Sequence, residues 1–134
     1  MPRRRAEPLW LARLVVDAIH TDQVREHGGL AGVRDKNALE SALASPRHNW
    51  LYDTTTDLST LAAAYACGLI QNHPYRDGNK RVGLLTMVTF LALNGLELDA
   101  GDPEILTVIV GVAASRVTEA DLATWLRRHT VPAR

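Results

Sequence analysis

The segment from residue 73 to residue 81 combines several side chains that could carry out phosphate chemistry. His73 is a possible base, because imidazole groups exchange protons near neutral pH. Asp77 offers one carboxylate, and Mg²⁺ in proteins is usually held by one or two carboxylates together with phosphate and water. Gly78 would let a phosphate approach the backbone closely. The segment therefore predicts a site for phosphoryl-type transfer, which depends mostly on positioning and electrostatics.

Three further residues place this predicted site at the start of a helix. Asp77-Gly78 is a turn dipeptide, and the apolar spacing of a helix begins just after Asn79. Helix starts attract anions because their first N–H groups lack intrahelical acceptors. Asn79 could bond a phosphate oxygen, while Lys80 and Arg81 could neutralise charge on the transferred group. Each residue alone has an ordinary interpretation as a turn, a cap or a solvated charge, and the combination favours a site.

Several other classes of protein do not fit the sequence. The glycine and lysine spacing of a Walker loop is absent, and no second His or Cys lies near His73, as a zinc site would require. Fifteen basic and fifteen acidic residues cancel, which argues against nucleic acid as the primary partner. No apolar run approaches the roughly 20 residues of a membrane span, and Arg13 and Asp17 interrupt any secretion signal. We expect a cytoplasmic protein with no membrane partner.

Composition and spacing predict an all-α fold in a single domain over residues 1–134. Hydrophobic residues make up 46% of the chain but aromatic residues only 5%, which favours helices packed on helices. Residues 1–6, with three consecutive arginines, are expected to form a flexible, solvated tail. Six helices are expected, at about residues 8–27, 36–44, 58–72, 79–93, 103–112 and 119–128.

Local signals predict how these helices begin and end. Asp35, Asp57 and Asp102 are expected N-caps, and Thr118 begins a capping-box pattern. Ser45-Pro46 is expected to end the second helix, which leaves residues 47–56 as a surface connection.

The remaining signals concern the ends of the two central helices. Pro74 excludes the helical conformation for His73 and predicts an extended one. Asn94-Gly95 predicts a left-handed end to the fourth helix, followed by a brief extended stretch over residues 96–98. Tyr75 is expected to pack inward beneath the loop, and Cys67 to pack in the core.

The sequence His73-Pro74-Tyr75-Arg76-Asp77-Gly78-Asn79-Lys80-Arg81 resembles the signature of the Fic/Doc family, in its Doc (death-on-curing) branch. The resemblance extends over nearly the whole chain, through Gly28-Gly29, Leu39-Glu40-Ser41-Ala42-Leu43 and Phe90-Leu91-Ala92-Leu93-Asn94-Gly95. It implies a compact helical bundle whose motif loop joins two central helices.

The resemblance also implies roles for the residues of the motif. His73 maps to the catalytic base and Asp77 to the Mg²⁺ ligand, with ATP as the substrate that donates phosphate. The residues that map to phosphate contacts are Gly78, Asn79, Lys80 and Arg81. The glycine-rich segment 28–34 resembles the flap that borders the side where the target protein docks.

Two positions resemble Doc proteins rather than general Fic enzymes, which transfer AMP to a target hydroxyl. Lys80 stands where those enzymes have a glycine, and Leu84 stands where they have a final arginine. Doc proteins share the lysine and resemble kinases that transfer the terminal phosphate of ATP to elongation factor Tu and arrest translation. Val82 and Gly83 depart from the Thr-Ala common in Doc-like sequences. A glycine here predicts either a looser helix start or unusually close packing.

The resemblance implies a toxin held silent by a cognate antitoxin, whose disordered tail folds into a groove of the toxin. Two alternatives stay open at this point. One is a nucleotidyltransferase that moves AMP or UMP to a protein hydroxyl with the same His73, Asp77 and Asn79. The other is a catalytically idle module that only binds an antitoxin.

Overall fold

The computed structural model describes residues 6–134, and six helices and two short strands form this part of the chain. The helices are α1 (Arg13–His27), α2 (Lys36–Tyr52), α3 (Leu58–Asn72), α4 (Asn79–Leu93), α5 (Asp102–Ala113) and α6 (Glu119–His129). The strands are β1 (Leu96–Leu98) and β2 (Thr130–Pro132), which pair antiparallel. The predicted all-α fold is confirmed. Residues 1–5 of the expected flexible tail lie outside the described residues.

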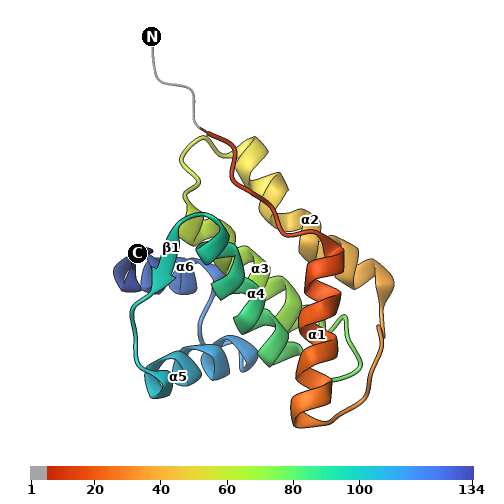
Figure 1. The fold of residues 1–134 in the computed structure, drawn as a ribbon. Coiled ribbons are helices and arrows are strands. Elements are labelled where there is room, and N and C mark those ends of the chain that lie inside the picture. The colour runs from red at the N-terminus through yellow and green to blue at the C-terminus, as the bar shows by residue number, and fades with distance from the viewer. Residues whose placement is uncertain (1–5) are drawn as a thin grey trace.

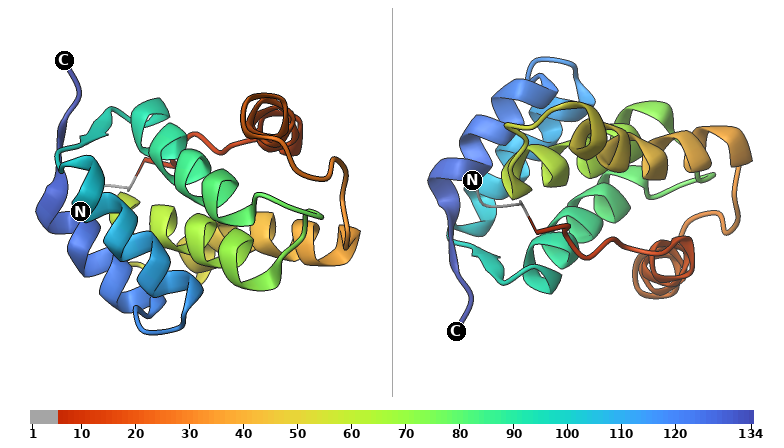
Figure 2. Two further views of the ribbon diagram at one scale, coloured as in Figure 1. Left: turned by 90° about the horizontal axis from the view of Figure 1, so that it is seen from below. Right: turned by 90° about the horizontal axis from the view of Figure 1, so that it is seen from above.

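Helix α3 lies at the centre of the bundle, where α2, α4 and α6 pack around it (Figures 1 and 2). Ten of its fifteen residues are buried, and four of them are the alanines at positions 62–64 and 66. Such small side chains let neighbouring helices approach from several directions. Cys67 lies in this core as predicted, and burial raises the pKa of its thiol to about 12. The thiol is therefore a packing group rather than a nucleophile.

The two helices that carry the motif loop approach each other closely at Gly83. A Cβ atom at this position would lie 2.6 Å from Cγ1 of Ile70 and 3.2 Å from the carbonyl oxygen of Ala66. No real Cβ contact is as short as the first distance, so a glycine is needed where α4 crosses α3. Of the two expectations for Gly83, close packing is the one observed.

The predicted end of the second helix is wrong. Helix α2 continues through Pro46 to Tyr52, and the expected surface connection shrinks to the residues between Tyr52 and Leu58. A proline inside a helix costs roughly 3 kcal/mol because it removes one hydrogen bond and crowds the preceding turn. Here Pro46 itself is buried and Trp50, one turn later, packs against the core. Tertiary packing outweighs the local signal.

The first helix also begins later than predicted, because the backbone before it is held by other contacts. The side-chain amide of Asn94 bonds both the N–H and the carbonyl oxygen of Leu9, at 2.8 and 2.9 Å. The N–H of Leu11 donates to the hydroxyl of Tyr65 at 3.2 Å. These bonds keep the segment non-helical up to Ala12, the N-cap residue of α1.

Most of the other predicted boundaries are confirmed. Asp35, Asp57 and Thr118 cap α2, α3 and α6, and the side chain of Asp121 completes the capping box. The expected extended stretch is β1, and its partner β2 was not predicted. Asp102 lies in the first turn of α5, whose N-cap residue is instead Gly101. None of the helices in residues 6–134 has the length and apolar character needed to cross a membrane.

Candidate active site

The segment 73–78 forms the loop between α3 and α4, as predicted. His73 ends α3 in the left-handed conformation, with φ 48° and ψ 54°, and Gly78 precedes α4 with φ 76°. The expected extended conformation of His73 is therefore wrong. Pro74 excludes the right-handed helical conformation at His73, and the chain meets this restriction with a left-handed helix cap instead. The His73 side chain is exposed, as the site requires.

The flap, residues 28–34, lies alongside this loop. Val33 forms a β-bridge with Tyr75, and the N–H of Arg76 donates to the carbonyl oxygen of Gly32 at 3.1 Å. The N–H of Arg34 donates to the carbonyl oxygen of Pro74 at 2.8 Å. Two segments about forty residues apart in sequence thus share backbone hydrogen bonds, and the loop is held in place from the side of the flap.

The flap also contacts the carboxylate of Asp77, the predicted metal ligand. Oδ2 accepts a hydrogen bond from the backbone N–H of Leu30 at 3.3 Å, and Oδ1 accepts one from Gly78 at 3.0 Å. A Cβ atom at Gly29 would lie only 2.7 Å from Oδ2. The carboxylate therefore lies directly against the flap backbone, while the residue as a whole stays exposed.

Tyr75 and Asn79 form a buried support beneath the loop. Tyr75 is 2% exposed, which confirms its predicted inward packing, and its hydroxyl donates to Oδ1 of Asp17 at 2.7 Å. Burial raises the pKa of this hydroxyl, and the bond to the Asp17 carboxylate raises it further. The side-chain amide of Asn79 bonds the backbone N–H and the carbonyl oxygen of Tyr75, both at 3.0 Å. These two bonds tie the first residue of α4 to the backbone of the loop.

The first turn of α4 is open to an anion. Its N-cap residue is Gly78, no side chain of the described residues caps it, and no acidic residue lies in the turn. The first N–H groups of a helix lack intrahelical acceptors and carry a partial positive charge. Lys80 and Arg81 in the same turn are exposed and add two full charges. This is the electrostatic environment that a polyphosphate requires.

A depression of about 340 Å³ opens over this helix start. Its lining residues are His73, Arg76, Asp77, Gly78, Asn79, Lys80 and Ala113. Five of the six predicted site residues meet there. Arg81 is the exception, because it lines a neighbouring groove between α4 and α5 together with Lys80 and Leu84. Arg76, which the sequence prediction did not single out, joins Lys80 as a second cation of the depression.

The donor groups of the depression fit Mg²⁺ rather than zinc. Asp77 supplies one hard oxygen ligand, and residues 6–134 contain no cluster of three His, Cys, Asp or Glu side chains that could enclose a metal ion. Mg²⁺ typically keeps several waters and binds through one or two carboxylates plus substrate phosphate, so a single carboxylate beside a phosphate site suits it.

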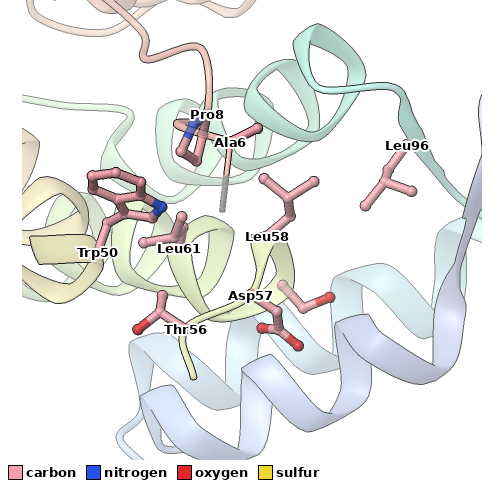
Figure 3. Close-up of a pocket in the computed structure, with 9 residues that line it drawn as sticks. Ala6, Pro8, Trp50, Thr56, Asp57, Leu58, Leu61 and Leu96 are labelled. Carbon is pink, nitrogen blue, oxygen red and sulfur yellow. The ribbon is translucent and has the colours of Figure 1, made fainter. Parts of the chain in front are cut away.

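A larger pocket of about 420 Å³ lies at the opposite end of α3 (Figure 3). Leu58, Leu61 and Leu96 give it an apolar lining, and no Lys, Arg or His among residues 6–134 lines it. Asp57 is its one carboxylate and is already paired with Arg127 at 2.7 Å. The described residues offer a phosphate no unpaired cation there, whereas Arg76 and Lys80 line the smaller depression over α4, which is therefore the candidate active site.

The fold and the geometry define a class of protein: a helical bundle with a candidate phosphate site in the loop between its two central helices. Residues 10–91 match the family model described as Fic/DOC family. The chain is 30% identical over 111 residues to Protein kinase doc of Escherichia phage P1, an alignment that covers 83% of this chain and 87% of that protein. It is 39% identical over 74 residues to Toxin Doc of Mycolicibacterium smegmatis, covering 54% and 57%. The chain belongs to the Fic/DOC family, in its Doc branch.

Proposed function

We propose that this protein is a Doc-type toxin that acts as a kinase, transferring the terminal phosphate of ATP to a hydroxyl of another protein. The observation that carries the proposal is the uncapped first turn of α4, where Lys80 lies beside His73 and Asp77 in one depression. The relative from Escherichia phage P1, which aligns with most of this chain, is named a protein kinase. The family resemblance points to elongation factor Tu as the target.

The residues of the depression suit an in-line phosphoryl transfer. The oxygen of the target hydroxyl forms a bond to the terminal phosphorus, the bond from that phosphorus to the bridging oxygen breaks, and ADP leaves. His73 accepts the proton of the hydroxyl. Lys80 and the free N–H groups of α4 stabilise the negative charge of the transferred group. Asp77 would hold Mg²⁺, which when bound offsets the charge of the phosphates.

The second candidate is transfer of AMP, and the groove beside Arg81 argues against it. Leu84 takes the position of the final arginine of general Fic enzymes and lines this groove with Leu106 and Val110. An apolar side chain there offers no hydrogen-bond donor to clamp a phosphate. Lys80 further replaces the bare glycine backbone against which those enzymes hold phosphate. Both differences favour transfer of the terminal phosphate.

The proposal includes a cognate antitoxin that silences the toxin, in keeping with the relative named Toxin Doc. It also places the protein in the cytoplasm, where ATP and translation factors are found. The third candidate, an idle antitoxin-binding module, has less support because His73 is exposed and the first turn of α4 is open. A module that only binds an antitoxin has no need of either feature.

The proposal is tested by incubating the purified chain with Mg²⁺, elongation factor Tu and ATP labelled at either the first or the last phosphate. We expect label only from the last phosphate, and none with His73→Ala. The variant His48→Ala, which removes an exposed histidine of α2, should label like the parent chain. Label from the first phosphate would establish nucleotidyl transfer instead. Growth inhibition that persists in His73→Ala would support the idle module.

A further inference from the structure

A buried histidine of α1 contacts the loop between α3 and α4 from the side of the protein interior. His20 is 3% exposed, and its Nε2 lies 2.9 Å from the backbone carbonyl oxygen of Asp77. A carbonyl oxygen only accepts hydrogen bonds, so Nε2 must carry the proton and donate it. The sequence pattern gave His20 no role, and none of the steps assigned to His73 or Lys80 uses it.

The imidazole of His20 is fixed in position by its neighbours. Its ring stacks on that of Tyr75, with centroids 4.0 Å apart and planes inclined by 11°. The hydroxyl of Tyr75 in turn donates to Asp17, one turn before His20 on the same face of α1. Two residues of α1 thus hold two residues of the motif loop, and the donor of His20 points at one backbone atom.

Within residues 6–134, this contact is the shortest hydrogen bond between Asp77 and a distant part of the chain. The other such bond, from Leu30 to the Asp77 carboxylate, measures 3.3 Å and comes from the exposed flap. The bond between Gly78 and the same carboxylate is local and does not fix the loop to the core. The backbone that projects the carboxylate is therefore tied to the protein interior through His20.

We propose that His20 is a positioning residue for Mg²⁺-dependent nucleotide binding, acting through the Asp77 carbonyl. The proposal rests on the proposed function, since it assumes that Asp77 binds the metal. Groups that orient a metal ligand from behind typically change metal affinity or activity by about 10- to 100-fold when they are removed. The donor matters here, because an apolar side chain could fill the same volume beside Tyr75.

The test is calorimetric titration of the full chain with a non-hydrolysable ATP analogue, once with Mg²⁺ and once with EDTA. The dissociation constant in EDTA divided by the dissociation constant in Mg²⁺ measures the metal-dependent part of binding. We expect His20→Met, which keeps bulk but has no donor, to lower this ratio by about 10- to 100-fold and to leave affinity in EDTA unchanged. His20→Gln retains an N–H about as far along the side chain and should restore the ratio. His48→Met on α2 is the matched control.

Each outcome decides the proposal. A folded His20→Met with the parent ratio overturns it, as does an equal loss of affinity with and without Mg²⁺, since a purely structural role would produce that. If His20→Met does not fold, the proposal is decided by His20→Gln, in which a lowered ratio overturns it and the parental ratio supports it. Failure of both variants to fold assigns His20 a structural role and overturns the proposal. Nucleotide binding is measured here without catalysis, so the result does not depend on whether the chain labels a protein. If the parent chain binds the Mg²⁺ complex but labels no protein, the proposed function fails while this inference stands.

Discussion

Arg34 donates a hydrogen bond from Nε to the backbone carbonyl oxygen of His73 over 2.7 Å, across 39 positions of sequence. Its Nη2 donates to the carbonyl oxygen of Asn72 at 3.0 Å. The two bonds satisfy carbonyl groups that α3 leaves without intrahelical partners at its end. They also hold His73 in a left-handed conformation, which costs a residue with a side chain roughly 1 kcal/mol or more. The flap thereby fixes the backbone of the proposed base.

We expect Arg34→Met to slow transfer by about 10- to 100-fold, because small displacements of a reacting group have effects of this size. Arg34→Lys should be nearly as slow, since a single ammonium group cannot reproduce the two donors of the guanidinium. Rates of labelling from ATP check this, with Arg25→Met, an exposed arginine in the last turn of α1, as the control. A parental rate in Arg34→Met would show that the flap does not position His73.

The fold was largely predictable because its signals are local. Caps at Asp35, Asp57 and Thr118, and the helical spacing between them, lie within a few residues of the boundaries that they set. Pro46 is one exception, because burial outweighs its local restriction, and the late start of α1 is another, because Asn94 and Tyr65 hold the backbone before it. Burial against another helix is not visible in a window of a few residues.

The residues of the candidate site also differ in whether local sequence signals predict them. His73, Asp77 and Lys80 could be predicted because they share one short segment with a turn and a helix start. The groups that hold this segment come from far away in sequence. His20 approaches from 57 positions upstream of Asp77, and Arg34 from the flap. Nothing in the sequence around either residue indicates these contacts, since a buried histidine and an exposed arginine are both common.

Gly29 and Gly28 form a matched pair for testing the contact between flap and carboxylate. Both have positive φ, 109° and 78°, so alanine is strained at either position. Only at Gly29 would the added Cβ meet Oδ2 of Asp77, at 2.7 Å, whereas nothing lies within 4 Å at Gly28. We expect Gly29→Ala to displace the carboxylate or the flap and to lower the Mg²⁺-dependent affinity for nucleotide by about tenfold or more.

The same strain provides the control for this prediction. Gly28→Ala should lower the free energy of unfolding by about 1 kcal/mol or more, as Gly29→Ala does, but keep the parental nucleotide affinity. Thermal melting and calorimetric titration measure the two quantities separately. Equal nucleotide affinity in the two variants would mean that Asp77 and Gly29 are not in functional contact.

Gly83→Ala should destabilise the protein although alanine is the better helix former. The gain in helix propensity is about 1 kcal/mol, whereas forcing a methyl group into a packed helix crossing costs about 1–3 kcal/mol. Urea denaturation would measure the net loss. Ile70→Ala removes both side-chain atoms that the new Cβ would meet, so the double variant should lose less than the sum of the two single losses. Strictly additive losses would place the strain of Gly83→Ala elsewhere.

We expect the free energy of unfolding to fall in acid because of Asp57, whose carboxylate caps α3 and pairs with Arg127 of α6. It accepts hydrogen bonds from the N–H of Thr60 at 2.9 Å and from Nε of Arg127 at 2.7 Å. Burial raises the pKa of this carboxyl, but the hydrogen bonds from Arg127 and Thr60 outweigh burial and lower it from 3.8 to about 2. A carboxyl whose pKa is lower in the folded than in the unfolded chain stabilises the fold once it is ionised in both.

This stabilisation should be complete at neutral pH and disappear as the pH falls from about 4 to about 2, the interval between the unfolded and folded pKa of Asp57. We expect Asp57→Asn to lower the free energy of unfolding at pH 7 and to reduce its slope across that interval. Asparagine remains a good N-cap, so the change reports chiefly the loss of the pair with Arg127. Because the pair is half-exposed, its contribution is small and should weaken with added salt. Arg127→Met provides the complementary test: by NMR titration, the pKa of Asp57 should move back toward 3.8, and an unchanged pKa would assign the shift to the cap alone.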